Sequence, residues 1–463
     1  MITLSLADIV IILAFFVVST IIGILGARGT GSKKRDYLLS GGKIGLTLFV
    51  MTNVSTWYGG ILGVGEYSFR YGLASWFTQG LPYYIFAVAF AFLFTKKIKA
   101  KDFYSIPDAI SHTYGSRVAR TASVLIFFLV SPAPYLLMVA YLLMVIFQIP
   151  LYAGLILSFF ISAAYLFKGG YKADVLTDAF FFIIMFSGFA VFLFILVSNF
   201  GGLDFLMENL PVQHLELTGG MPFPVILVWW FVALWTFADP GFYQRVGGAV
   251  SWRVARKGII ISVFFWFIFD ILTNGVGLYG RAVMPGLKQP VLTFPLLAEK
   301  VLSSGLKGFF IIALLATILS TLNSFLFLSA VTFGNDLFPA KNGSDNEKNT
   351  ISRVKIGLIV SGVFAIALCL YIPSVIEIWY TVGSICIPGI ILLIFSSYFP
   401  GFRINKAFAI IELTGATIIS LGWHLLRQYG ILTAFLNNVE PMITGLIFAV
   451  IIHLAGMKQK IRT

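Results

Sequence analysis

The sequence predicts an all-α, polytopic membrane protein with about thirteen transmembrane helices. Of the 463 residues, 59% are hydrophobic and 11% are charged, whereas about a quarter of the residues in a typical soluble domain are charged. The mean hydropathy is +0.94. Apolar stretches of about 20 residues, long enough to cross a bilayer as a helix, recur along the chain. We therefore expect a single transmembrane domain over residues 1–463, with the lipid bilayer as its surroundings.

The apolar segments are arranged as two repeats flanked by accessory helices. An accessory helix at 5–26 comes first, and the next five segments form a repeat at 44–199. Five more form a second repeat at 222–398, and accessory helices at 407–456 follow. Because each repeat has an odd number of spans, the second repeat is inverted relative to the first. The segments are 5–26, 44–66, 74–95, 118–147, 150–167, 175–199, 222–241, 258–279, 308–333, 355–372, 375–398, 407–426 and 439–456.

The first helix of each predicted repeat is interrupted. Gly59 and Gly60 lie within the segment 44–66, and Asp239 precedes a proline and a glycine in the corresponding segment of the second repeat. Glycine weakens a helix, and proline frees a backbone carbonyl one turn earlier. Paired interruptions in two repeats indicate a binding site near the bilayer midplane. The alternative for the first break is a glycine-rich face that packs against a neighbouring helix.

The basic residues predict the orientation of the chain. Most of the 32 Lys and Arg gather in alternate loops, as they do on the cytoplasmic side of membrane proteins. We therefore expect an external N-terminus, a cytoplasmic C-terminus and a multi-pass protein of the plasma (inner) membrane. The net charge of +13 then reflects topology and lipid headgroup contact rather than nucleic-acid binding. The basic residues on the outer side are Arg70, Arg281, Lys288, Lys300, Lys307 and Arg427.

Residues suited to catalysis are scattered along the chain. The two cysteines, Cys369 and Cys386, lie within apolar segments and have no metal-binding spacing. The four histidines are also unpaired in the sequence, and the acidic residues are dispersed. The sequence therefore predicts no enzyme and no catalytic residues. It also lacks the pore-lining charge rings or carbonyl-filter loop of a channel.

The span within residues 310–337 carries the clearest polar face. Thr317, Ser320, Thr321 and Ser324 lie on one side of a helix with 3.6 residues per turn. Their hydroxyls and nearby carbonyls are hard oxygen ligands, which suit a small hard cation such as Na⁺. The alternative is that these hydroxyls bond carbonyls of their own helix or join neighbouring helices.

Acidic residues lie within two other spans. Asp174 and Asp178 occupy the first turns of the sixth span, where a carboxylate can cap the helix. Asp178 lies deeper than a cap requires, and an acidic group inside a span indicates function. In the eighth span, Asp270 and Asn274 lie four residues apart. We expect their side chains to bond to each other.

Four stretches resemble the sodium:solute symporter family, which transports sugars, proline, pantothenate, choline, iodide and sialic acid with Na⁺. They are YLLSGGKIG, GGYKADVLTDAFFFIIMFSG, DPGFYQRV and LLATILSTLNSFLFLSAVTFGNDLF. The resemblance covers roughly residues 5–456. It implies a fold similar to that of the leucine transporter, with two inverted five-helix repeats. It also implies Na⁺-coupled symport of a small organic solute into the cell by alternating access.

The resemblance implies positions for two Na⁺ ions, the only cofactor expected. The first site takes three backbone carbonyls and two hydroxyls, from Met51, Val54, Thr317, Ser320 and Thr321. A second site, which some members of the family have nearer the cytoplasm, takes Asp178, Ser320, Asn323 and Ser324. Asn323 stands where the family often has serine, and its amide oxygen can still bind a cation.

Solute-contacting positions carried over from the family are Asn53, Trp57, Tyr58, Gln79, Tyr83, Trp235 and Asp239. At Trp57 the sequence resembles the choline-transporting branch of the family, in which aromatic faces hold a quaternary ammonium. That branch has an aromatic residue where this chain has Asp239. An acidic group there favours a cationic solute, or it caps the half-helix that follows. The sequence thus leaves the solute class open.

Two other functions share these features. One is a symporter driven by protons rather than Na⁺, and the other is a solute-sensing membrane receptor that lacks its signalling domain. The partners expected in either case are the small-molecule solute and the bilayer, with the chain a monomer or a weak homodimer. Nucleic acid is not an expected partner.

Overall fold

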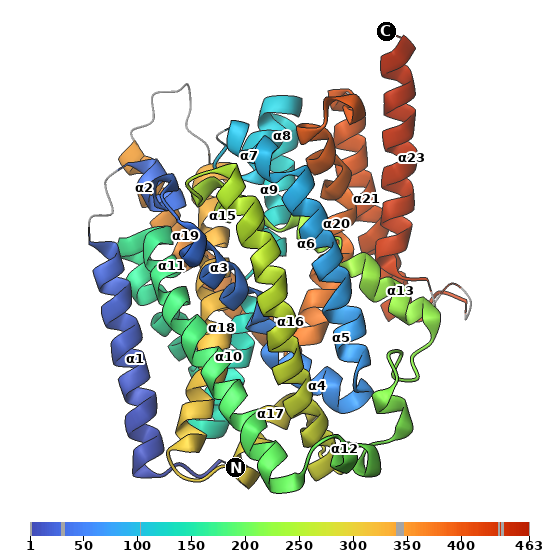
Figure 1. The fold of residues 1–463 in the computed structure, drawn as a ribbon. Coiled ribbons are helices and arrows are strands. Elements are labelled where there is room, and N and C mark those ends of the chain that lie inside the picture. Colours follow the sequence, from blue (N-terminus) through green and yellow to red (C-terminus); the bar gives the residue numbers. More distant parts are fainter. Residues whose placement is uncertain are drawn as a thin grey trace.

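The chain folds as a bundle of helices (Figure 1). The computed structural model describes residues 2–28, 33–101, 103–338, 347–433, 436 and 439–462, and these contain no β-strand. Eleven helices of this described part are long and apolar enough to cross a membrane. The structure therefore confirms an all-α, polytopic membrane protein.

The two remaining predicted spans are present but are not long, uninterrupted helices. Segment 44–66 consists of α3 (Leu46–Ser55), the 3₁₀ turn η2 (Thr56–Gly60) and α4 (Ile61–Tyr71). Segment 150–167 is the first half of α11 (Leu151–Phe200). Gly170, with φ +55° and ψ −146°, interrupts α11. A residue with a side chain would be strained at this φ, so the glycine makes the division into two spans possible.

The other predicted spans are present as well, and segments 74–95 and 118–147 are each divided into two helices. The remaining helices are α1 (Leu6–Ala27), α2 (Lys34–Leu39), α5 (Ala74–Gln79), α6 (Leu81–Leu93), α7 (Thr95–Lys101), α8 (Ile106–Tyr114), α9 (Ser116–Leu129), α10 (Ala133–Phe147), α12 (Leu203–Asn209), α13 (Phe223–Val232), α14 (Trp235–Ala238), α15 (Pro240–Gly248), α16 (Trp252–Val283), α17 (Thr293–Val301), α18 (Leu306–Val331), α19 (Glu347–Tyr371), α20 (Val375–Tyr398), α21 (Lys406–Gln428) and α23 (Pro441–Arg462). Short 3₁₀ or π turns are η1 (Ser40–Gly42), η3 (Val212–Leu215), η4 (Pro290–Leu292), η5 (Thr332–Leu337) and η6 (Pro400–Phe402).

Helix α18 forms the centre of the bundle. Its apolar, membrane-spanning stretch is completely buried inside the protein. The helix packs against α11, η2, α19 and α1. The accessory helix α1 is fastened to it by Asp8, whose Oδ1 accepts the backbone N–H groups of Gly305 (2.8 Å) and Gly308 (2.7 Å). Since a carboxylate stabilises the N-terminus of a helix, Asp8 caps α18 from a different helix.

The predicted break in the seventh span is also present. Asp239 has an extended backbone (φ −75°, ψ 110°) between α14 and α15, and its Oδ1 accepts the N–H of Gly241 at 2.8 Å. Asp239 is therefore the N-cap of α15. Pro240 follows at the first helical position, where its missing N–H is not needed.

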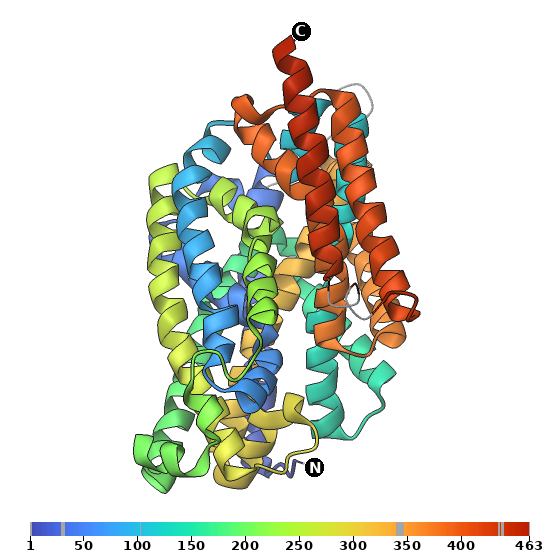
Figure 2. The ribbon, with the colours of Figure 1, turned by 90° about the vertical axis from the view of Figure 1, so that its right-hand side faces the viewer.

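The last two long helices, α21 and α23, pack on each other and on α20 at one side of the bundle (Figure 2). His453 of α23 lies with Nδ1 2.7 Å from Oε2 of Glu412 on α21. This pair explains the buried acidic residue in an otherwise apolar accessory helix. The chain ends lie at opposite ends of the bundle (Figure 1).

Candidate functional site

The candidate cation site lies where η2, α11 and α18 meet. A Cβ atom built at Gly59 would lie 2.2 Å from both Cβ and Oγ1 of Thr321. Only glycine permits so close an approach between the break in the second span and α18. The interruption of the helix and the packing of α18 against it therefore depend on the same residue.

The two halves of the first predicted Na⁺ site lie together. Thr321 Oγ1 donates to the carbonyl of Thr56 at 2.6 Å, and Ser320 Oγ lies 3.0 Å from Ser55 Oγ. Ser55 in turn donates to the carbonyl of Met51 at 2.9 Å. These bonds join α18 to the broken helix that carries the predicted carbonyl ligands.

The other predicted ligands of that site, Val54 and Thr317, are buried. Val54 is fully buried on α3. The Thr317 hydroxyl donates to the carbonyl of Ala313 on its own helix at 2.7 Å, so Thr317 has its backbone carbonyl, rather than its hydroxyl, to offer. The alternative of purely intrahelical bonding holds for Thr317 but not for Ser320, Thr321 or Ser324.

Asp178 is the centre of a hydroxyl cluster. It is fully buried on α11, and its carboxylate accepts from Ser320 at 2.5 Å, from Thr52 at 2.5 Å and from Thr56 at 3.2 Å. Oxygen atoms from α11, from α18 and from the broken helix α3/η2 thus meet at this carboxylate. Carboxylate, hydroxyl and carbonyl oxygens are the ligands that hard cations prefer, so the cluster fits Na⁺.

Asp174 is a member of this cluster that the sequence did not identify. It was expected to cap the sixth span, but it is fully buried, and its Oδ2 accepts from Ser324 Oγ at 2.6 Å. Its Oδ1 has no hydrogen-bond partner among the described residues. Arg245 Nη2 donates to the same Ser324 Oγ at 3.4 Å. Ser324 therefore faces Asp174 and Arg245, and Asn323 lies fully buried beside it on α18.

A repeated four-residue spacing in the sequence would have identified Asp174 as a member of the cluster. Asp174 and Asp178 on α11 have the same spacing as Ser320 and Ser324 on α18. Residues four apart lie above one another on a helix. The two pairs therefore form successive levels where the helices face each other.

A cavity of about 280 Å³ adjoins the cation site. All seven predicted solute-contacting residues lie on its wall, namely Asn53, Trp57, Tyr58, Gln79, Tyr83, Trp235 and Asp239. A cavity of this size takes a small organic molecule. It reaches Val225 of α13, which is 42% exposed, and ends near Arg245 of α15, which is 4% exposed. The lining thus runs from an exposed residue of α13 to a buried residue of α15.

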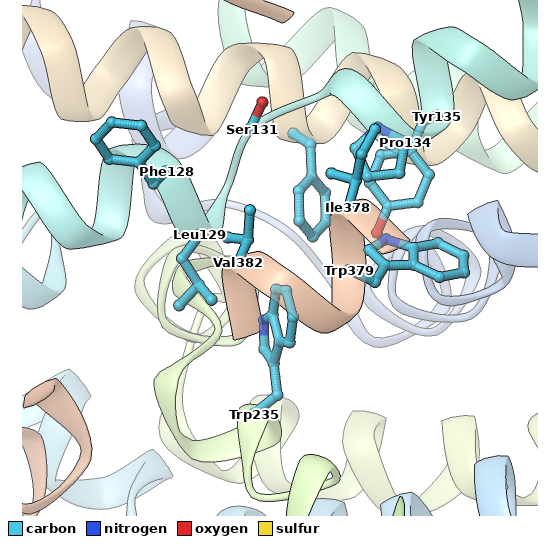
Figure 3. A pocket seen from close by; sticks show the side chains of 10 residues that line it. Phe128, Leu129, Ser131, Pro134, Tyr135, Trp235, Ile378, Trp379 and Val382 are labelled. Atoms are coloured by element: carbon cyan, nitrogen blue, oxygen red, sulfur yellow. The ribbon is translucent and has the colours of Figure 1, made fainter. Parts of the chain in front are cut away.

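A side pocket of about 10 Å³ shares part of the cavity wall (Figure 3). Tyr135, Trp235 and Trp379 line both spaces. Figure 3 shows Trp235 of α14 and Trp379 of α20 on facing elements around the pocket. The pocket has room for about one water molecule, so the larger cavity is the candidate site for a solute.

Replacing Gly59 with alanine is expected to disrupt the cation site. The new Cβ would overlap Thr321 Cβ at 2.2 Å, and a rotation of the Thr321 side chain cannot move that atom away. We expect the variant to lose Na⁺-specific thermal stabilisation, measured as melting temperature in Na⁺ against K⁺. The matched control is Gly422→Ala in α21, where a Cβ meets nothing within 4 Å and alanine favours the helix by up to about 1 kcal/mol. A Gly59→Ala protein with an unchanged Na⁺ response would contradict this placement of the site.

Comparison with known proteins identifies relatives over most of the chain. The model of the sodium:solute symporter family matches residues 37–409. A sodium/proline symporter of Staphylococcus aureus (strain JH9) is 23% identical over 442 residues, covering 89% of this chain and 85% of the relative. Sodium/proline symporters from other strains of that species match equally well.

Solved structures share the fold. The substrate-bound, outward-open state of a Na⁺-coupled sialic acid symporter superposes with a TM-score of 0.82 at 15% identity, covering 98% of each chain. A closed, ligand-bound transporter of the nucleobase-cation-symport-1 family superposes with a TM-score of 0.59 at 13% identity, covering 89% of this chain and 92% of that one. Both similarities concern the arrangement of helices.

Proposed function

The chain belongs to the sodium:solute symporter family, and we propose that its α3/η2–α11–α18 junction binds Na⁺ while the adjoining cavity binds a small organic solute. The protein is a Na⁺-coupled symporter with a multi-pass membrane domain. The observation that carries the site assignment is the hydroxyl cluster around the buried Asp178. Isolated buried carboxylates are costly, and a bound cation offsets that cost.

The first proposed Na⁺ position uses the ligands predicted from the family. In the structure, Thr321 and Ser320 bond to Thr56 and Ser55. A Na⁺ ion between α18 and the broken helix would bind the hydroxyls of Ser320 and Thr321 in place of these contacts, together with the carbonyls of Met51, Val54 and Thr317. The second proposed position lies at Asp178, with Ser320 shared between the two. Asp174 and Ser324 form the next level toward Arg245.

Thr56 supplies the physical link between ion and solute. Its hydroxyl donates to Asp178, its carbonyl accepts from Thr321, and the residue also lines the cavity. Binding of Na⁺ therefore fixes the same turn that shapes the solute site. By linkage, a solute that prefers this ordered turn raises the affinity for Na⁺ by the same factor.

Transport follows from the asymmetry of the cavity. We propose that the end at α13 is open and faces outside and that the end at α15 is closed and faces the cytoplasm, in keeping with the basic loops and with the proposed plasma-membrane location. The two broken spans belong to the proposed repeats 44–199 and 222–398. Rocking one bundle against the other then closes the outer end and opens the inner one. No catalytic role is proposed.

The test is accumulation in proteoliposomes. A library of amino acids, sugars and organic ions is screened for uptake under an inward Na⁺ gradient, with an equal K⁺ gradient as the control. We expect accumulation only in Na⁺, and its loss when an ionophore dissipates the gradient. Accumulation driven by an inward proton gradient in Na⁺-free buffer would instead establish proton coupling. Binding of a solute without any accumulation would establish a receptor.

A further inference from the structure

The walls of the cavity carry excess negative charge. Asp239, Asp270 and Glu440 line it, and Arg245 is the one Lys or Arg among its described lining residues. Glu440 is balanced by Arg427, whose Nη1 lies 2.8 Å from its Oε2. Two carboxylates therefore remain against one guanidinium within the cavity.

The guanidinium of Arg245 lines the end of the cavity beside α11 and α18. Its Nη2 donates to Ser324, which itself donates to Asp174, and Asp178 lies one turn further along the same helix. Arg245 thus faces the two carboxylates of α11. A carboxylate on a solute would find no other Lys or Arg among the described lining residues of the cavity.

Asp270 has no such counter-charge. It is 7% exposed, and no ion pair joins it to a described Lys, Arg or His. Its carboxylate accepts a hydrogen bond from the hydroxyl of Tyr84. The expected bond to the Asn274 side chain is absent, since that amide donates to the backbone carbonyl of Asp270 at 2.9 Å and accepts from Ser68 at 2.8 Å.

The position of Asp270 is set by the break between α5 and α6. A Cβ at Gly80 would lie 2.6 Å from Oδ2 of Asp270, so the glycine lets the carboxylate reach the chain between the two helices. Gln79, Gly80 and Asp270 all line the cavity. The carboxylate is therefore part of the solute-facing wall.

Aromatic rings of Trp57 and Tyr83 also line the cavity. The ring centroid of Trp57 lies 4.8 Å from that of Tyr83 and 4.8 Å from that of Trp266. Electron-rich faces attract an ammonium group, and more strongly in a desolvated site. Asn53 Nδ2 is buried without an acceptor among the described residues. The cavity therefore presents a carboxylate, ring faces and one hydrogen-bond donor.

We propose that the solute is a small organic cation, and that Asp270 is the counter-ion of its ammonium group. Trp57 and Tyr83 supply the ring faces around that group, and Asn53 donates to an acceptor on the solute. The inference rests on the proposed function, because it names the solute class of that symport. In this proposal the three positive charges of two Na⁺ ions and Arg245 balance the three carboxylates Asp174, Asp178 and Asp239. The negative charge of Asp270 is then balanced by the solute.

The test compares solutes that differ in charge. Melting temperatures of detergent-purified protein are measured in saturating Na⁺ with choline, 1,4-diaminobutane, proline, sialic acid and 3,3-dimethyl-1-butanol, the uncharged carbon isostere of choline. We expect Na⁺-dependent stabilisation by at least one of the cations and none by the isostere.

Asp270→Asn, which keeps an acceptor for Tyr84, is expected to lower cation affinity about tenfold or more. Glu412→Gln, a buried carboxylate outside the cavity, is the matched control and leaves that affinity unchanged.

Each outcome separates the solute class from Na⁺ coupling. Stabilisation by proline or sialic acid but by neither cation overturns the proposal, and so does the absence of any cation response. An Asp270→Asn protein with wild-type cation affinity also overturns it. The charge series needs no variant, so it decides the question even if Asp270→Asn fails to fold. The difference in melting temperature between Na⁺ and K⁺ is measured in parallel without solute. If the wild type shows no such difference, the proposed Na⁺ coupling is contradicted instead.

Discussion

Thr321→Ala is expected to remove the part of the Na⁺ stabilisation that comes from the first proposed site. A ligand that binds only the folded state adds RT ln(1 + [L]/Kd), which is about 2.7 kcal/mol when Na⁺ is present at about 100 times its Kd. The substitution removes the hydroxyl that bonds the carbonyl of Thr56 and that is proposed to bind Na⁺. The measurement is the melting temperature in Na⁺ and in K⁺ at matched ionic strength.

Two further variants separate a lost ligand from a damaged helix. Thr321→Ser keeps the hydroxyl and should keep most of the Na⁺ effect. Ser329→Ala removes a fully buried hydroxyl from the same helix, and that hydroxyl has no hydrogen-bond partner among the described residues. We therefore expect Ser329→Ala to leave the Na⁺ shift intact. An equal Na⁺ shift in Thr321→Ala and wild type would place the ion elsewhere.

Features that depend on neighbouring residues in the chain were predictable from the sequence. Glycines at 59 and 60 weaken their helix locally, and the proline of the Asp239-Pro240-Gly241 run removes a backbone donor from its own. The structure confirms both breaks, as α3/η2/α4 and as α14/α15. The polar face of α18 was likewise visible, because helical periodicity alone brings Ser320 and Ser324 together.

Features that depend on packing between helices were not predictable. Asp174 was interpreted as a helix cap, yet the break at Gly170, where φ is positive, and the approach of α18 bury it against Ser324. The expected Asp270–Asn274 side-chain bond was wrong for a related reason. Asn274 is held by Ser68 of α4, a partner more than 200 positions away that no local pattern indicates. Repeat boundaries and the oligomeric state remain predictions.

Asp178→Asn is expected to weaken Na⁺ binding without unfolding the protein. The amide removes the negative charge, while its oxygen can still accept from Thr52 or Ser320, and its N–H groups can donate to the same hydroxyls. Each loss of about 1.4 kcal/mol lowers affinity tenfold, and a hydrogen bond to a charged group contributes about 1.5–3 kcal/mol. We therefore expect the apparent Na⁺ affinity to fall about tenfold or more, and the number of bound ²²Na⁺ per protein to fall by one.

The same variant distinguishes the coupling ion. With Na⁺ coupling, Asp178→Asn keeps the first site, so the Thr321-dependent Na⁺ shift persists in weakened form and uptake still requires Na⁺. With proton coupling, wild-type uptake responds to the pH gradient in the absence of Na⁺, and Asp178→Asn removes that response.

Glu412→Gln again controls for loss of a buried carboxylate, because Glu412 pairs with His453 between α21 and α23, far along the chain from the cluster. If ²²Na⁺ stoichiometry is the same in wild type and Asp178→Asn, Asp178 is not a Na⁺ ligand, and the hydroxyl cluster around it serves only to join the three helices.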